Sequence, residues 1–155
     1  MRAAALISVL VLVLAGCKSA PKILTSLPQN KLNHAALLLD SESIGAIRVV
    51  HSPPSEHPSR IALDALLLHS PYSLELSETA LDARRSRVAV ALRSSDAVNA
   101  DWSGDVNWGM VLYDHSGKEM IRIGFDESGR RGFVGTDAVR MNDNLLGLCR
   151  KLMPE

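Results

Sequence analysis

Residues 107–136 read NWGMVLYDHSGKEMIRIGFDESGRRGFVGT, and this stretch decides the fold class. The turn from Asp114 to Gly117 recurs as the turn from Asp126 to Gly129. Asp opens such turns by accepting backbone N–H hydrogen bonds, and Gly supplies the left-handed conformation that closes them. Apolar residues alternate with other residues on both sides of the turns, as in half-buried strands. The stretch therefore predicts a three-stranded antiparallel meander with strands near 107–114, 118–126 and 131–136.

A long helix is predicted upstream of the meander, over about residues 79–97. Thr79 and Asp82 have the spacing of a capping box at its start. Its apolar residues Leu81, Val88 and Leu92 fall on one stripe. Because the arginines of this segment lie largely elsewhere, we expect the stripe to pack on the sheet and the arginines to face solvent.

A second helix is predicted at the C-terminal end, over about residues 142–152, with Asn142 or Asp143 as its cap. Its buried face consists of Leu145, Leu148, Cys149 and Leu152. Cys149 lies late in this helix and on its apolar stripe, whereas a catalytic thiol needs a nearby base or a helix N-terminus. We therefore expect Cys149 to be a core residue and not a nucleophile.

The first half of the domain gives weaker signals. The apolar run at 35–39 and the β-branched run at 44–50 are compatible with a hairpin. Residues 60–68 fit either a short helix or a buried strand, and residues 72–76 alternate as in a strand. Together these patterns predict a single α+β domain over residues 34–155, built on an antiparallel sheet of four to six strands.

The N-terminus carries a targeting pattern. Arg2 is followed by a short apolar run that ends in Leu14-Ala15-Gly16-Cys17, and the run is too short to cross a bilayer as a helix. The last four of these residues resemble the lipobox of bacterial lipoproteins. The resemblance implies that residues 1–16 are a signal peptide, removed in front of Cys17, and that Cys17 receives lipid chains. The alternative is an ordinary secretory signal with an incidental cysteine, or an uncleaved anchor.

A lipidated Cys17 predicts attachment to a membrane, with residues 17–33 as a tether for the domain. A segment packed on the domain through Ile23, Leu24 and Leu27 is the alternative to the tether. The residue after the cysteine is Lys18. In Gram-negative lipoproteins an aspartate at that place commonly marks the inner membrane, so Lys18 favours the outer membrane, facing the periplasm.

Composition excludes several classes of protein. The chain has 155 residues, 17 basic and 17 acidic side chains, and two cysteines. This balance argues against nucleic acid as a partner, because such proteins carry a basic surface. Two cysteines exclude a disulfide-dense scaffold and a four-cysteine zinc site. No sequence motif indicates a cofactor or a set of catalytic residues.

The candidate recognition site is the loop between Trp102 and Trp108, which also holds Asp105. Exposed tryptophan is favoured at interfaces, whereas the alternative is one core tryptophan and one that is partly buried. Two metal sites are conceivable but not favoured. One is a zinc site at His51, Glu56, His57 and His69, and the other is calcium at the two Asp-x-Ser-Gly turns.

The leading functional hypothesis is a non-enzymatic, membrane-anchored envelope module that binds a protein or an envelope polymer. The alternatives are an envelope inhibitor or small-ligand-binding lipoprotein, and an enzyme whose site is assembled only by the fold.

Overall fold

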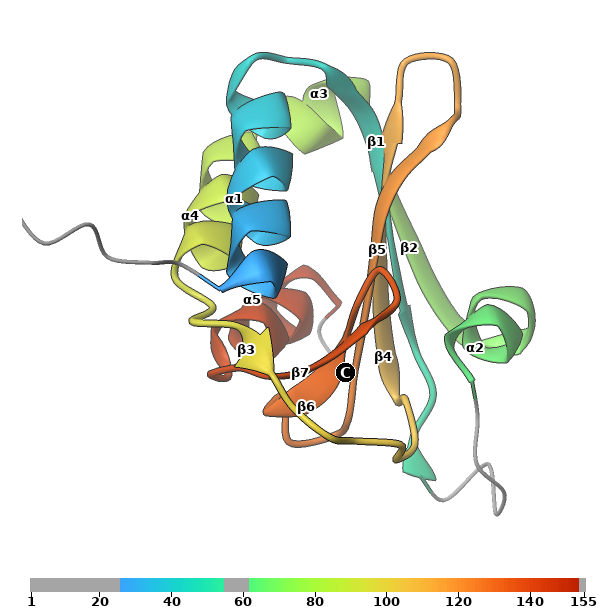
Figure 1. Cartoon of the computed structure of the whole chain (residues 1–155). Coiled ribbons are helices and arrows are strands. Elements are labelled where there is room, and N and C mark those ends of the chain that lie inside the picture. The colour runs from blue at the N-terminus through green and yellow to red at the C-terminus, as the bar shows by residue number, and fades with distance from the viewer. Residues whose placement is uncertain (1–25, 55–61, 154–155) are drawn as a thin grey trace, which may run out of the picture.

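The computed structural model describes residues 26–54 and 62–153 (Figure 1). Along the chain its elements are α1 (Leu27–Asp40), β1 (Ile44–His51), α2 (Leu63–His69), β2 (Tyr72–Ser77), α3 (Glu78–Asp82), α4 (Arg85–Arg93), β3 (Val98–Asn99), β4 (Trp108–Asp114), β5 (Glu119–Phe125), β6 (Arg131–Val134), β7 (Asp137–Arg140) and α5 (Asn144–Leu152). The predicted signal peptide, Cys17 and residues 18–25 lie outside the described residues. None of the described helices is long and apolar enough to cross a membrane.

The described strands form one antiparallel sheet in the order β2-β1-β4-β5-β6-β7-β3. Strands β4, β5 and β6 are the three strands predicted from the repeated turns, and the α+β class is confirmed. The meander continues beyond the prediction into β7, and the two-residue β3 ends the sheet at that edge. The sheet thus has seven strands within the described residues, one more than the upper end of the expected range.

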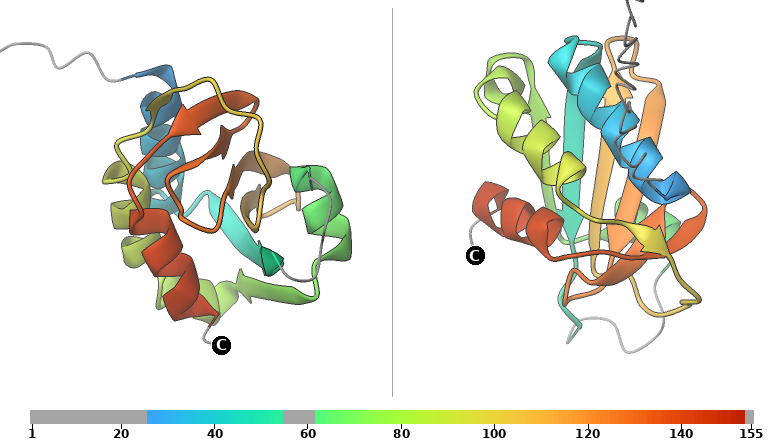
Figure 2. Two further views of the ribbon diagram at one scale, coloured as in Figure 1. Left: turned by 90° about the horizontal axis from the view of Figure 1, so that it is seen from below. Right: turned by 60° about the vertical axis from the view of Figure 1, so that its left-hand side comes forward.

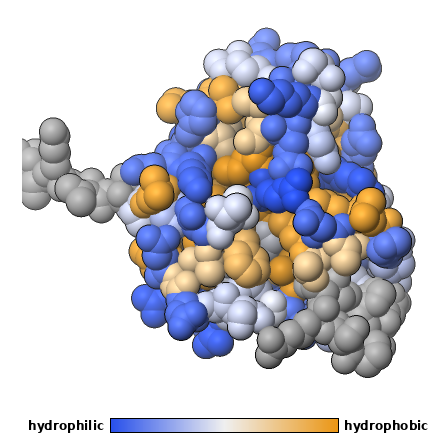
Figure 3. Space-filling view, turned by 45° about the vertical axis from the view of Figure 1, so that its right-hand side comes forward, coloured by the Kyte–Doolittle hydropathy of each residue, from blue (hydrophilic) through white to orange (hydrophobic). Residues whose placement is uncertain are grey.

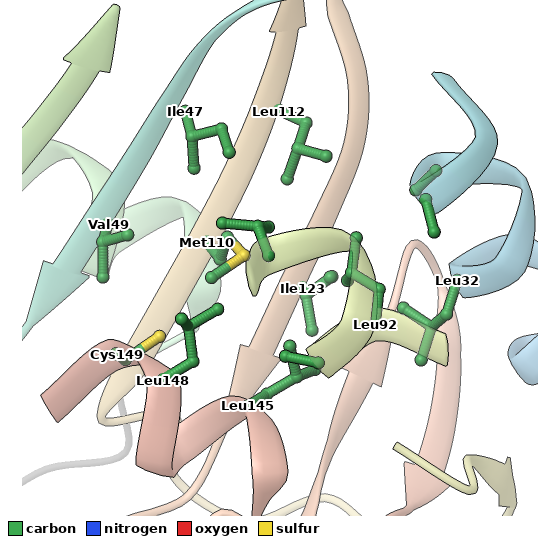
Figure 4. Close-up of a cluster of buried hydrophobic side chains, with 14 of the residues drawn as sticks. Leu32, Ile47, Val49, Leu92, Met110, Leu112, Ile123, Leu145, Leu148 and Cys149 are labelled. Carbon is green, nitrogen blue, oxygen red and sulfur yellow. The ribbon is translucent and has the colours of Figure 1, made fainter. Parts of the chain in front are cut away.

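Helices α1, α4 and α5 cover one face of the sheet, and α2 lies on the other face (Figures 1 and 2). The main core lies under the three helices (Figure 4). There Ile47, Met110 and Ile123 of the sheet meet Leu92 of α4 and Leu145 of α5, and all five are 0% exposed. Burial of each such side chain contributes about 1.5–3 kcal/mol.

The structure corrects the last part of the predicted tether and the predicted hairpin, because residues 27–33 and 35–39 both belong to α1, whereas residues 17–25 of the tether lie outside the described residues. Ser26 is the N-cap and accepts a hydrogen bond from the Gln29 N–H at 3.4 Å. Pro28 stands in the first turn, where a missing N–H costs nothing. The buried stripe of α1 is Leu32, Ala35, Ala36 and Leu39. This i, i+3, i+4, i+7 spacing is the sequence signal for the helix that was missed.

The single helix predicted over 79–97 is also wrong, because the chain breaks at Arg84 into α3 and α4. The Arg84 backbone (φ −122°, ψ −11°) leaves the helical conformation. The break directs Arg85 toward the start of β1, where its Nη1 donates a hydrogen bond to the Ile44 carbonyl at 3.0 Å. Thr79 lies inside α3, so it caps no helix.

The other predicted elements are found close to their expected places. Strands β1 and β2 confirm the patterns at 44–50 and 72–76, and α2 shows that most of the ambiguous segment 60–68 is helical. The C-terminal helix is confirmed as α5. Asp143 occupies its N-cap position without a side-chain hydrogen bond, whereas the Asn142 Oδ1 accepts one from the Asn144 N–H at 3.1 Å.

Helix α2 packs on bare backbone. Gly109 and Gly124 face each other in the register of β4 and β5. A Cβ on Gly109 would lie 2.9 Å from Leu63 Cδ1, and a Cβ on Gly124 would lie 3.2 Å from the same atom. Arg122 also holds α2 through an ion pair with Asp64. Figure 3 shows this side of the molecule, with apolar residues gathered in the middle and hydrophilic residues around and across them.

The first hairpin turn is held by the Asp114 carboxylate, as the repeat predicts. Its Oδ1 accepts hydrogen bonds from the Ser116 Oγ at 2.6 Å and from the Lys118 N–H at 3.0 Å. Gly117 adopts a φ of +79°. The hydrogen bond from Ser116, followed by that from Lys118, lowers the pKa of Asp114 below its ordinary value.

We expect Asp114→Asn to destabilise the domain in a pH-dependent way. A lowered folded-state pKa adds stability above the unfolded-state pKa, and this stability is lost as the pH falls through the folded-state pKa. The difference in unfolding free energy between the wild type and the variant should therefore be largest near neutral pH and shrink below about pH 4. Urea unfolding at about pH 6 and about pH 2 measures it. An equal loss of unfolding free energy at both pH values would contradict the expectation.

Candidate functional site

A hollow with a volume of about 670 Å³ lies between α1 and β5. We call it the α1–β5 groove. It is lined by one side of α1 from Asn30 to Leu38, by Ile44, by β5 residues 119–122 and by the turn at Gly135 and Thr136. Because these segments are far apart in the sequence, the groove exists only in the folded domain.

The floor of the groove is apolar, and β5 is uncovered along it. Ala35, Leu38, Ile44 and Ile121 supply aliphatic surface. The register of β5 with β6 ends at Ile123, so β5 residues 119–121 have no strand on that side within the described residues. Met120 is unmatched in the register with β4, where the ladder shifts as in a β-bulge, and its side chain is 40% exposed. Bulges of this kind redirect a side chain next to binding sites.

The rim of the groove is polar and internally paired. Lys31 on the groove donates a hydrogen bond of 2.7 Å to Asp137, next to the turn at Gly135 and Thr136. Arg122 donates two hydrogen bonds of 2.6 Å to Glu119, and these raise the pKa of its guanidinium. Since the charges are paired, the groove presents an apolar floor inside a nearly neutral rim.

A second hollow, of about 530 Å³, lies between α4 and α5. Arg87 and Lys151 stand on its rim, and Val90 on its wall is 58% exposed. This hollow is a furrow between two helices, whereas the α1–β5 groove combines a helix, a sheet edge and a turn.

The two tryptophans of the predicted recognition loop follow the alternative interpretation, with one in the core and one partly buried. Trp108 is only 2% exposed and stacks on His51, with ring centroids 3.8 Å apart. Its ring therefore belongs to the core and takes no part in an exposed surface. Trp102 is half-buried and packs against Phe133 at 5.1 Å between ring centroids, whereas Asp105 is exposed. A role of Trp102 and Asp105 in recognition stays a prediction.

A small polar network that the sequence did not reveal borders Trp108. The His51 Nε2 lies 3.4 Å from the Glu127 Oε2, and the Arg150 Nη2 donates to the other oxygen of Glu127 at 3.2 Å. His51 comes from β1 and Arg150 from α5, so the network joins the sheet to the C-terminal helix. We interpret it as a structural link that orients the His51 ring on Trp108.

Cys149 is 0% exposed, as predicted for a core residue. Burial raises the pKa of its thiol to about 12, so the thiol stays protonated near neutral pH. It packs with Leu148 of the same helix against the sheet (Figure 4).

The metal alternatives gain no support from the part of the chain that the structure describes. Within residues 26–54 and 62–153, no group of three or more His, Cys, Asp or Glu side chains is suited to a metal ion. Glu56 and His57 of the zinc alternative lie outside these ranges. His51 is engaged with Trp108, and His69 is the last residue of α2.

No family model, no curated protein and no solved structure matches the chain. Its function must therefore be inferred from the residues and their arrangement.

Proposed function

We propose that this protein is a lipid-anchored module of the bacterial cell envelope that binds another protein or an envelope polymer in the α1–β5 groove. The observation that carries the binding role is the apolar floor of the groove beside the uncovered stretch of β5. A concave apolar surface left open in a folded domain is the usual form of a binding site. A polypeptide segment fits best, because it offers both apolar side chains for the floor and backbone groups for the strand edge.

The anchor is proposed from the Leu14-Ala15-Gly16-Cys17 pattern. Two or three acyl chains on Cys17 hold a protein at a membrane stably, whereas one chain holds it weakly. Lys18 favours the outer membrane if the host is Gram-negative. The groove volume of about 670 Å³ also suits a small ligand, so the small-ligand lipoprotein is the second candidate.

Site-specific photo-crosslinking in cells tests both the binding role of the groove and the lipid anchor. A photoreactive residue is placed at Met120 in the groove or, as a matched exposed apolar control, at Leu68 on α2, which is 77% exposed. We expect a discrete adduct from Met120 and none from Leu68. Cys17→Ala should remove lipid labelling, release the protein from the membrane fraction and abolish the adduct. The same adducts from both positions would refute the groove as the site, and an unlabelled wild type would refute the anchor.

Filling the groove provides an independent check. Thr136→Trp places a large side chain at the groove, and Thr79→Trp makes the same change at an exposed site on α3. We expect Thr136→Trp to lower the Met120 crosslinking yield about tenfold, a change of about 1.4 kcal/mol in binding free energy, and Thr79→Trp to leave it unchanged. Equal yields in the two variants would contradict the proposal. A small ligand would be indicated by adducts whose added mass is too low for a protein.

A further inference from the structure

The chain enters the described domain beside β3. Ser26, the first described residue, donates a hydrogen bond from its Oγ to the carbonyl of Ala97, immediately before β3. Cys17 stands nine residues before Ser26 (26 − 17). A chain of that length spans at most about 30 Å even when fully extended. If Cys17 carries the proposed lipid, this end of the domain is therefore held close to the membrane surface.

The same end exposes apolar and basic side chains together. Leu27, next to the entry point, is 61% exposed, and Val98 on β3 is 39% exposed. Val98 pairs with Arg140 in the register of β3 and β7, and Arg140 pairs with Arg131 in the register of β7 and β6. Directly paired residues point to the same face of a sheet, so these three side chains form a row. Both arginines are exposed, and no ion pair is found for them within the described residues.

We infer that the surface around β3, formed by the row Val98, Arg140 and Arg131 with Leu27 at the start of α1, lies against the anionic phospholipid surface to which the domain is anchored. Exposed aliphatic side chains enter the headgroup region, and arginine hydrogen-bonds to lipid phosphates. Asp101, exposed just after β3, offsets part of the positive charge of this surface. The surface is therefore suited to orienting a domain that the lipid has already brought to the membrane, and not to recruiting a free one.

The inferred orientation also places the rest of the molecule. The hairpin between β4 and β5 stands at the opposite end from β3 and β7 (Figures 1 and 2). With β3 at the membrane, that hairpin and the uncovered part of β5 point away from the lipid. This inference rests on the proposed anchor, which supplies the membrane.

Cysteine accessibility in vesicles tests the orientation. The lipidated protein, which begins at Cys17, is reconstituted into phosphatidylethanolamine–phosphatidylglycerol vesicles and treated with a bulky, charged maleimide. Cys17 is then blocked by lipid and Cys149 is buried, so an introduced cysteine reports alone. We expect Val98→Cys to react at least about tenfold more slowly in vesicles than in detergent, and Ser116→Cys, in the β4–β5 hairpin, to react equally fast in both.

Charge-neutralising variants provide the matched control. In the Val98→Cys background, Arg131→Gln with Arg140→Gln should restore fast labelling of the introduced thiol in vesicles. Arg87→Gln with Lys151→Gln, exposed on α4 and α5, should not restore it.

Vesicle flotation separates the two ways in which the inference can fail. Val98→Cys protein that floats while its introduced thiol reacts at the detergent rate would overturn the orientation and leave the anchor standing. A lipobox-intact protein that does not float would overturn the anchor and, with it, the inference.

Discussion

Gly132→Ala is expected to lower the free energy of unfolding by about 3 kcal/mol, the upper part of the range for overpacking. A Cβ at this position would overlap the carbonyl oxygen of Gly124 and lie 2.8 Å from the Cα of Phe125. Both atoms belong to the backbone of β5, so neither can rotate away as a side chain does. The extra methyl group therefore forces β5 and β6 apart in the middle of the meander.

Urea unfolding followed by circular dichroism measures this effect. In thermal unfolding, the melting temperature of the variant should fall by about 10 °C for a domain of this size. Gly147→Ala in α5 is the matched control, because a Cβ there meets no atom within 4 Å. We expect that control to be neutral or to stabilise by about 0.5–1 kcal/mol, since alanine favours a helix over glycine. A Gly132→Ala variant as stable as the wild type would show that β5 and β6 are not packed this closely.

Trp108→Ala is expected to destabilise the domain by about 3–5 kcal/mol. The indole is buried in the main core, stacks on His51 and faces Phe125 in the register of β4 and β5. A domain of this size has a total stability of about 5–15 kcal/mol, so a large part of it would be lost. Thermal unfolding followed by near-UV circular dichroism gives the measurement.

Trp108→Phe separates packing from hydrogen bonding. The indole Nε1 has no hydrogen-bond partner within the described residues, so phenylalanine removes volume and little else. We expect it to cost less than half of the alanine effect. A phenylalanine variant as unstable as the alanine variant would contradict this expectation. Loss of partner binding in Trp108→Ala would report loss of the fold, so Trp102→Ala is the variant that tests the recognition loop.

The accuracy of the sequence-based predictions depended on how local each signal was. Asp114 and Gly117 determine their turn through contacts within a few residues, and the three predicted strands around the turns end within one or two residues of their predicted bounds. α1 was missed because Pro28 was assigned to a tether, although it stands in the first helical turn. The helix from 79 to 97 was predicted as continuous because the groups that Arg85 reaches after the break at Arg84, the carbonyls of Leu39 in α1 and Ile44 in β1, are distant in the sequence.

The candidate site was beyond the reach of the sequence. Lys31 and Leu38 lie on one wall of the α1–β5 groove and Met120 lies on the other, and only the packing of α1 over the sheet brings them together. Trp108 was placed on a recognition surface because a loop precedes it. It is buried in the main core and stacks on His51, and these contacts come from segments distant in the sequence.

By itself, the sequence determined the α+β class and the hairpins of the meander, and it supplied the pattern behind the proposed lipid anchor. These features depend on residues close together in the chain, where turn geometry and apolar spacing act directly. The tertiary structure alone decided which tryptophan is buried, where the helices break and where a groove opens. Each of these depends on contacts between distant segments, and composition and periodicity carry no information about such contacts.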